Sequence, residues 1–586
     1  MKKNFPGFFD LQSLRPRFFE IFHRPEQGKA YGPRDFTKDL LAGFVVGIVA
    51  LPLSMAFSIS AGGSPVQGIY TAIAAGFFVS LLGGSKFQIA GPTGAFVVII
   101  FNVAAKHGIE GLIAAGLIAG LILVGMGLSG LGKFITYIPY PVTTGFTAGI
   151  GVLIFSQQIK DFLGLSIDSV SPGFVAKWAD HFRYIETFNP AAMGVGIGTI
   201  VIIILLRRLA PRVPAAALAV TAATLVCHFF KLETLPRWPV ETIGARFGLI
   251  PSSLPIPAFP RLSWGLVQAV FPDAFTIAML AAIESLLSAV VADSMTGDRH
   301  NANMELAAQG IGNIASAFFG GIPATGAIAR TAANIKNGAV SPVAGIIHSL
   351  TLLGFILFLA PAASTIPLAS LAGVLIVVAW DMSGAGRFIR LVKTSLKSDA
   401  AVLLVTFVLT VAFDLTFAVE VGVIMAVFLF LRRMVAVSAI KLENTDLMTD
   451  LAYGEIKEDT RDKLIALSRQ RIEVYEITGP FFFGIADMLQ NTIRNFSKTP
   501  KVLIIRMRNV PVIDATGITA LESLMRQCRT RKITLLITEI QDQPQRALEK
   551  TGFISALGRE NTIDFFDDAV AAALRESAEG HKSESL

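Results

Sequence analysis

The chain has 586 residues, 53% of them hydrophobic and 16% charged, with a formal net charge of +7. Soluble proteins carry roughly 25% charged residues and do not need apolar runs as long as "LVQAVFPDAFTIAMLAAIESLLSAVVAD". A transmembrane helix needs about 20 mostly apolar residues, whereas barrel strands alternate over about 10 residues, a pattern not visible here. The composition excludes a soluble protein and a membrane barrel, and it predicts a polytopic α-helical membrane protein.

Residues 1–38 lack the apolar core and cleavage site of a signal peptide, so we predict a cytoplasmic N-terminal region. A transmembrane domain is predicted over residues 39–435. It contains about fourteen apolar segments: Leu40–Ser60, Val66–Leu82, Gly91–Ala105, Gly111–Leu131, Val142–Phe155, Ala191–Leu206, Pro214–Phe230, Val267–Ala292, Glu305–Phe319, Gly326–Ile335, Val343–Leu359, Pro367–Trp380, Ala400–Asp414 and Ala418–Leu431.

The basic residues indicate the orientation of these segments. Eight Lys and Arg residues precede the first segment, and further clusters lie at 207–212, 387–397 and 432–433. With the N-terminus inside, every cluster falls on the cytoplasmic side, as the positive-inside rule requires. We therefore expect a multi-pass protein of the cell inner (plasma) membrane with both termini in the cytoplasm. The loops 160–190 and 231–266 then lie outside.

The last part of the chain has a different character. Residues 436–470 are predicted as a linker and the start of a soluble region, and residues 576–586 as a disordered tail. Between them, over residues 471–575, "KVLIIRM" and "KITLLIT" are short β-rich runs that flank a helical pattern, "DATGITALESLMRQC". This order predicts a small α/β domain.

Two of the apolar segments, Gly91–Ala105 and Gly326–Ile335, are too short to cross a membrane and resemble each other. The stretches that hold them, from Gly83 and from Gly320, each have a Gly-Gly, then a Pro, then Thr-Gly-Ala, at Thr93–Ala95 and Thr325–Ala327. Each is third in a set of seven, so the two sets would insert with opposite orientation. Such pairs indicate the substrate site of an inverted-repeat transporter, because the starts of two half-helices offer unpaired N–H groups to an anion. The alternative is a chance match.

Two of the ionisable residues in the apolar segments are candidates for function. Arg330 lies one turn into the second short segment, and an intramembrane charge is a functional candidate by default. The alternative for Arg330 is a structural ion pair with a neighbouring carboxylate. Glu284 shares a helix face with Ser288, and this pair could bind a proton, or with carbonyl groups a small cation. The hydroxyls of Thr93 and Thr325 could either cap a helix or contact substrate.

Three stretches carry a family resemblance: "GPTGAFVVI", "IESLLSAVVADSMTGDRHNANMELAAQGIGNIASAFFGGIPATGAIARTAANIKNGAVSP" and "VPVIDATGITAL". With them the chain resembles, over nearly its whole length, the sulfate permease (SulP) family of anion transporters with a C-terminal STAS domain. The resemblance implies two inverted repeats of seven segments, roughly 39–230 and 266–435. These would form core and gate domains that move as an elevator, usually in a dimer.

The resemblance also implies site residues. Glu284 and Ser288 match positions near the coupling-ion site. The residues expected to bind substrate are Phe57, Thr93, Gly94, Thr325, Ala327, Ile328, Ala329 and Arg330.

The first segment departs from the family pattern. Leu53 follows Pro52 where Gln is common, and Phe57 stands where Tyr is usual. Two polar groups are thereby lost from the expected pocket wall, which favours an anion with some apolar surface over a small, heavily hydrated one. Ala329 likewise replaces a hydroxyl, so backbone N–H groups and Arg330 remain as donors.

The soluble region holds one candidate regulatory loop. Asp514 and Thr516 lie in "DATG", which resembles the phosphorylation loop of bacterial anti-sigma-factor antagonists. The alternative is a loop kept for its turn and helix-cap geometry.

No enzyme motif is present, and the two cysteines indicate neither a disulfide nor a metal site. We expect a secondary active transporter with sulfate as the default anion and bicarbonate or a C4-dicarboxylate as rivals, coupled to H⁺ or Na⁺ and without other cofactors. Expected partners are the anion, the bilayer, a second copy of the chain and a cytosolic regulator of the STAS domain, but no nucleic acid. A channel-like conductor and an anion sensor are the alternative functions.

Overall fold

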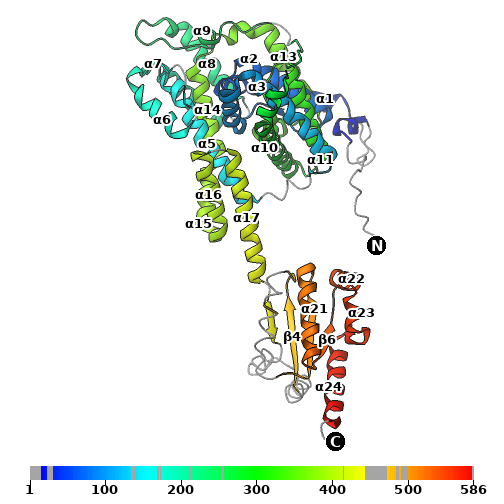
Figure 1. Cartoon of the computed structure of the whole chain (residues 1–586). Coiled ribbons are helices and arrows are strands. Elements are labelled where there is room, and N and C mark those ends of the chain that lie inside the picture. Colours follow the sequence, from blue (N-terminus) through cyan, green and yellow to red (C-terminus); the bar gives the residue numbers. More distant parts are fainter. Residues whose placement is uncertain are drawn as a thin grey trace. The chain divides into compact units, whose positions relative to one another are not determined.

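The structure is a computed structural model of the whole chain, which forms two compact units, Met1–Ala426 and Val427–Leu586 (Figure 1). The residues that it describes are 15–22, 31–132, 139–167, 170–171, 173–210, 213–252, 256–260, 262–413, 415–437, 439–442, 471–482, 488–489 and 499–583. Eight helices in this described part are long and apolar enough to cross a membrane.

The predicted segments are found as helices. The long ones are α1 (Pro33–Ser60), α2 (Pro65–Leu82), α3 (Gly94–Leu128), α5 (Tyr140–Leu163), α7 (Pro190–Leu209), α8 (Ala215–Phe229), α10 (Trp264–Thr296), α11 (Ala302–Phe318), α12 (Ile328–Lys336), α13 (Val343–Ala363), α14 (Leu368–Ser383), α16 (Lys397–Ala412) and α17 (Leu415–Val437). Shorter elements are η2 (Arg17–Phe22), α6 (Phe174–Arg183), α9 (Ile243–Phe247) and α15 (Ala385–Thr394).

Two boundaries differ from the prediction. α1 begins at Pro33, within the range 1–38 predicted as a cytoplasmic region, because proline is well suited to the first turn of a helix. α3 contains two predicted segments, Gly91–Ala105 and Gly111–Leu131, joined at a kink where Gly108 has φ 70° and ψ 179°. This backbone conformation favours glycine, so the kink is encoded by a single residue.

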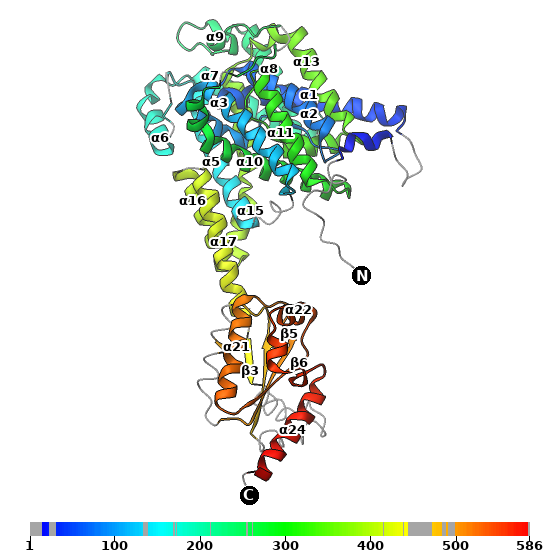
Figure 2. The same ribbon diagram turned by 45° about the vertical axis from the view of Figure 1, so that its right-hand side comes forward.

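The helices of the first unit form two groups, a core and a gate. In the core, α1 packs against α13, α10 against α3, and α11 against α2 and α3. In the gate, α5 packs against α14 and α16, and α7 against α8 and α14. Figures 1 and 2 show the two groups side by side.

The packing repeats itself, as an inverted duplication requires. The first helix of each repeat packs against the fourth segment of the other repeat, which gives the pairs α1–α13 and α10–α3. The third segments of the two repeats are the start of α3 and α12. Each follows a two-residue strand, β1 (Ala90–Gly91) or β2 (Thr325–Gly326), and the two strands pair antiparallel inside the core.

The second unit is a five-stranded sheet in the order β3-β4-β5-β6-β7, in which β3 is antiparallel to β4 and the other neighbours are parallel. Both faces are covered: Ile505 of β5 packs with Leu521, and Ile504 packs with Val570. The elements are β3 (Ala439–Leu442), β4 (Ile472–Thr478), β5 (Val502–Asn509), β6 (Thr534–Thr538), β7 (Thr562–Ile563), α21 (Ala515–Thr530), α22 (Asp542–Lys550), α23 (Phe553–Leu557) and α24 (Phe566–Ser583).

Two features of this unit refine the sequence interpretation. β3 lies inside the range 436–470, predicted as a linker and the start of the soluble region, and it is the first strand of the sheet. α24 continues to Ser583, into the range 576–586 predicted as a disordered tail, and the last three residues lie outside the described part. Ala569 and Ala573 of this helix are buried and pack against the sheet.

Candidate functional site

The paired strands β1 and β2 bring the starts of α3 and α12 together. Ala90 lies opposite Gly326, and the Ala327 N–H donates to the carbonyl of Ile89 at 2.8 Å. The N–H groups of Gly94 and Ile328, at the first position of each helix, have no partner among the described residues. Two sets of free donors and two positive helix ends therefore meet in the core.

Arg330 lies across the residues that lead into α3. It is 3% exposed, and its Nη2 donates to the carbonyl of Pro92. Its Nη1 is buried without a hydrogen-bond partner in the described part of the chain. A Cβ atom at Gly91 would lie 2.7 Å from this nitrogen, so glycine is needed for the guanidinium to reach the start of α3. One charged donor is thus held ready at the junction of the two helices.

Glu284 reaches the same junction from α10. Its Oε2 accepts a hydrogen bond from the Thr93 hydroxyl at 3.0 Å, and its exposed fraction is 8%. Thr93 is the residue that precedes α3, yet its hydroxyl makes no capping hydrogen bond. Glu284 and Arg330, both described residues, form no ion pair with each other. A structural Arg–Glu pair therefore does not explain Arg330.

Ser288 has a different partner from Glu284, although the two share a face of α10. The Ser288 hydroxyl donates to Thr331 Oγ1 at 3.2 Å, and that oxygen accepts from the Ile89 N–H at 3.1 Å. Ser288 therefore ties α10 to α12 and β1. The two predicted coupling residues do not converge on one point.

Thr325 does not lie at the start of a helix. It belongs to β2, is fully buried, and its hydroxyl contacts Ser285 Oγ at 2.9 Å. The residue before α12 is Ala327, whereas the residue before α3 is Thr93. Relative to the helix starts, the two Thr-Gly-Ala motifs are thus two residues out of register, because Thr93 directly precedes α3, whereas Thr325 stands three residues before the first residue of α12. The prediction that both threonines begin a half-helix was wrong for Thr325.

The wall of the site is apolar on the α3 side and open on the α12 side. A Cβ atom at Gly94 would lie 2.7 Å from Met382 Sδ, 3.0 Å from Ile154 Cδ1 and 3.3 Å from Phe57 Cε1. By contrast Ile328 is 39% exposed, and Ala329 is also exposed. The gate therefore covers the start of α3 and leaves the start of α12 accessible.

Three polar residues of the site were missed by the sequence interpretation: Gln88, Ser285 and Thr331. Ser285 Oγ accepts from the Gly326 N–H at 2.9 Å, and Gln88 Nε2 donates to the Ser285 carbonyl at 3.0 Å. The available signal was the same for all three, a polar residue in or beside an apolar segment. They hold the strand pair against α10.

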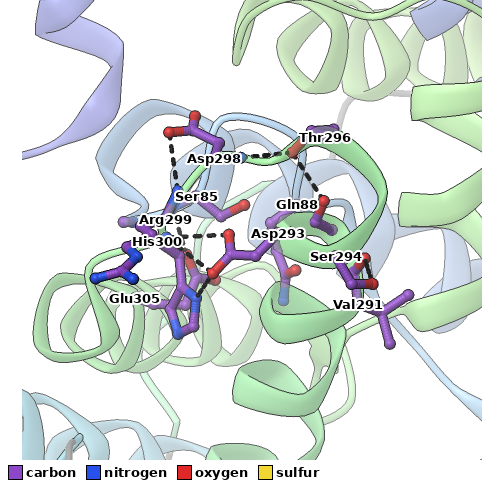
Figure 3. A network of polar contacts seen from close by, with 12 residues as sticks. Ser85, Gln88, Val291, Asp293, Ser294, Thr296, Asp298, Arg299, His300 and Glu305 are labelled. Atoms are coloured by element: carbon purple, nitrogen blue, oxygen red, sulfur yellow. Dashed lines mark hydrogen bonds and ion pairs between the residues drawn. The ribbon is translucent and has the colours of Figure 1, made fainter.

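The long motif that follows Glu284 forms a separate network at the α10–α11 turn (Figure 3). Asp293 accepts from the His300 N–H at 3.0 Å and contacts His300 Nδ1 at 2.7 Å. Glu305 accepts from the N–H groups of Gly84 and Ser85 at 3.0 and 3.1 Å. This network joins α10 and α11 to the loop after α2, so it supports the strand pair from one end of the core.

The candidate regulatory loop is a helix cap. Asp514 precedes α21, and its side chain accepts from the Gly517 N–H at 2.8 Å. A Cβ atom at Gly517 would lie 2.5 Å from the Phe481 carbonyl, so the loop needs glycine there. Thr516 is exposed. The contacts of Asp514 are those of the capping alternative.

Two half-helix starts held together within inverted repeats, with a buried arginine between them, define the inverted-repeat class of membrane transporters. The chain belongs to the sulfate permease family, whose sequence profile matches residues 36–406, and the STAS domain profile matches residues 463–569. It is thus a multi-pass membrane protein of the SulP/SLC26 type, a family of sulfate and bicarbonate transporters, and its relatives are named as transporters and not as enzymes.

Three relatives show the extent of the similarity. YvdB of Bacillus subtilis (strain 168), named as a candidate sulfate transporter, is 41% identical over 541 residues, which is 92% of this chain and 98% of that protein. The bicarbonate transporter BicA of Picosynechococcus sp. is 30% identical over 528 residues, or 88% and 91% of the two chains. The structure of murine Slc26a9 in the inward-facing state shares the fold, with a TM-score of 0.82 at 19% identity, covering 98% and 96% of the chains.

Proposed function

We propose that the chain is a secondary active transporter that moves a small oxyanion or carboxylate by an elevator motion of its core. The observation that carries this proposal is the Arg330 guanidinium, buried between two half-helix starts with one nitrogen unpartnered. An anion there would receive one full charge and the free N–H groups of Gly94 and Ile328. The accessible start of α12 supplies its way in.

The walls favour a monovalent anion of the bicarbonate or carboxylate type over sulfate. Phe57, Ile154 and Met382 surround Gly94 with apolar atoms, which cannot replace the hydration shell of a divalent anion. BicA, a bicarbonate transporter by name, is 30% identical to this chain. Sulfate remains the alternative substrate, supported by the name of the Bacillus relative YvdB.

Glu284 is the proposed coupling residue, and a proton is the proposed coupling ion. The carboxylate has the Thr93 hydroxyl as a partner and lies close to the anion site, so its charge and that of the anion influence each other. Na⁺ needs several oxygen ligands, but the Ser288 hydroxyl is directed to Thr331. Protonation of Glu284 would remove a negative charge from beside the incoming anion and thereby favour its binding.

The orientation and assembly extend the proposal. The positive-inside pattern supports insertion in the cell inner membrane with both termini in the cytoplasm. The STAS domain is proposed to support a homodimer and to bind a cytosolic regulator, since its α21 side carries exposed residues such as Thr516.

The test is uptake into proteoliposomes of labelled bicarbonate, succinate and sulfate, each measured against pH and Na⁺ for wild type and Glu284→Gln. We expect the wild type to take up the carboxylate or bicarbonate faster at low pH, and the variant to lose that pH dependence while still binding the anion. If wild-type uptake depends on Na⁺ and the variant loses that dependence, the coupling ion is Na⁺ and not a proton. Identical profiles in both proteins would contradict a coupling role for Glu284.

A further inference from the structure

A buried lysine lies outside the candidate site on α6, which packs against the gate helices α5 and α16. The buried face of α6 carries Lys177, 4% exposed, and His181, 3% exposed. His181 is anchored, because its Nε2 lies 2.9 Å from the Ser156 carbonyl of α5. Lys177 has neither a hydrogen bond nor an ion pair within the described part of the chain. Its nearest recorded partner is the ring of Phe101, whose centroid is 5.1 Å from Nζ.

Lys177 lines a cavity of about 50 Å³ between core and gate. The core contributes one face of α3, with Phe101 and Asn102, and the gate contributes Gln157 of α5 and Thr410 of α16. A cavity volume of roughly 10–15 Å³ is enough to hold one water molecule. The space therefore suits a small anion of the size of nitrate or bicarbonate with its nearest waters.

The cavity lies along α3, between this helix and α6. α3 starts at the site with Gly94, and Val98 and Asn102 line the cavity four and eight residues later. At 1.5 Å per residue these positions are about 6 and 12 Å along the helix axis from its start. Gln157, which lines the cavity, donates to the Ser60 carbonyl, and Gln158 Nε2 donates to Ser60 Oγ at 3.0 Å. Gate and core are therefore in contact beside the cavity.

An unpaired ammonium group in such a place lacks a counter-charge. Burying a charge is costly unless it is paired, and a lysine brings three donors that need acceptors. Burial lowers the pKa of Lys177 to about 8. The neighbouring ionisable groups do not supply that counter-charge. Asp180 accepts from the Ser171 N–H, and Lys160, itself a cation, donates to the Ile167 carbonyl. Burial lowers the pKa of His181, which favours its neutral form.

We propose that this cavity is a second anion site, in which Lys177 and the amide of Asn102 hold a small monovalent anion between the α6 face and the half-helix site. The direction in which the anion moves through this site rests on the proposed function, but the binding of the anion does not. When core and gate separate, the anion passes along the exposed face of α3 toward Gly94. In this structure α1 and α5 are joined beside the site by the hydrogen bond from Gln158 to Ser60.

The test removes the first site and asks what binding remains. In purified Arg330→Ala protein, thermal unfolding is followed in sodium nitrate against an equal ionic strength of sodium gluconate, an anion too large for the cavity. A ligand that binds the folded state raises its stability in proportion to ln(1 + [L]/Kd). We expect nitrate to stabilise Arg330→Ala and to lose this effect in Arg330→Ala/Lys177→Gln. Lys106→Gln in the same background is the matched control. Lys106 is a lysine of α3, the helix that lines the cavity, but its side chain is 57% exposed and its Nζ lies 3.7 Å from Asp273 Oδ1.

A second arm covers the case in which Lys177→Gln folds poorly. Lys177→Arg keeps the charge, so it should keep the nitrate effect at pH 7 and also at pH 9.5, where lysine at this position is neutral and Arg330→Ala alone should have lost the effect. Nitrate stabilisation that is absent from Arg330→Ala, or equal in the Lys177→Gln and Lys106→Gln backgrounds, would overturn the second site. Failure of wild-type uptake would instead overturn the proposed function, and the binding result would still stand.

Discussion

The two half-helices begin alike in backbone but differently in side chains. α12 begins at Ile328, which is exposed, and brings the charge of Arg330 two residues later, within its first turn. α3 begins at Gly94, is covered by Met382 and Ile154 of the gate, and brings the Thr93 hydroxyl, which donates to Glu284. The inverted repeat therefore supplies symmetric backbone donors, while the charge and the coupling contact come from opposite halves.

Keeping the positive charge and the carboxylate on separate partners has a physical advantage. A full positive charge next to a carboxylate would form a buried ion pair, and such pairs are hard to open once formed. Here Arg330 binds the Pro92 carbonyl, and Glu284 binds the next residue, Thr93. The two charges are linked through adjacent residues that precede α3 and not directly, so an anion can engage one without first breaking a bond to the other.

The largest expected effect comes from removing the positive charge on the α12 side of the site. Arg330→Ala should reduce the apparent affinity for the transported anion at least ten-fold, because hydrogen bonds to charged groups contribute about 1.5–3 kcal/mol. Lys336→Ala, an exposed cation at the end of the same helix, is the matched control and should leave affinity unchanged. Uptake kinetics at several anion concentrations measure both. Equal affinity in the two variants would contradict the role of Arg330.

A smaller effect separates the two threonines. Thr93→Val removes the hydrogen bond that Glu284 accepts from the Thr93 hydroxyl and should lower the apparent anion affinity about five-fold, since a net hydrogen bond contributes about 1 kcal/mol. Thr325→Val leaves Ser285 without its hydroxyl partner and should lower the melting temperature while transport affinity stays unchanged. Paired measurements of uptake and thermal unfolding check this. The reverse pattern would place Thr325 and not Thr93 at the anion.

The smallest effect concerns the cover over α3. Gly94→Ala places a methyl group 2.7 Å from Met382 Sδ, so core and gate must shift slightly. Overpacking costs about 1–3 kcal/mol, and the flexible methionine keeps the cost at the low end, so we expect a loss of up to about five-fold in transport rate. Adding Met382→Ala should restore the rate. Ile328→Ala, at the open start of α12, should change it little.

The site residues differ in how far the sequence alone could place them. Arg330 and Glu284 were predicted because charges within apolar segments are rare and expensive. Ser288 was predicted beside Glu284 from helical spacing, but spacing does not say which neighbouring helix supplies the partner, and Thr331 does. Thr325 was predicted from a three-residue match, and the strand pairing overruled that match. Phe57 was placed by resemblance, and it does lie against Gly94.

The sequence by itself determined the membrane class, the helices and the two interrupted segments, because a bilayer accepts only long apolar runs and makes each exception visible. Only the tertiary structure decided the offset of the two half-helices, the separate partners of Arg330 and Glu284, and the enclosure of Lys177. These depend on contacts between residues far apart in the chain, such as Thr93 with Glu284, Arg330 with Pro92 and Lys177 with Phe101. The packing of one repeat against the other brings such residues together, and no local pattern records it.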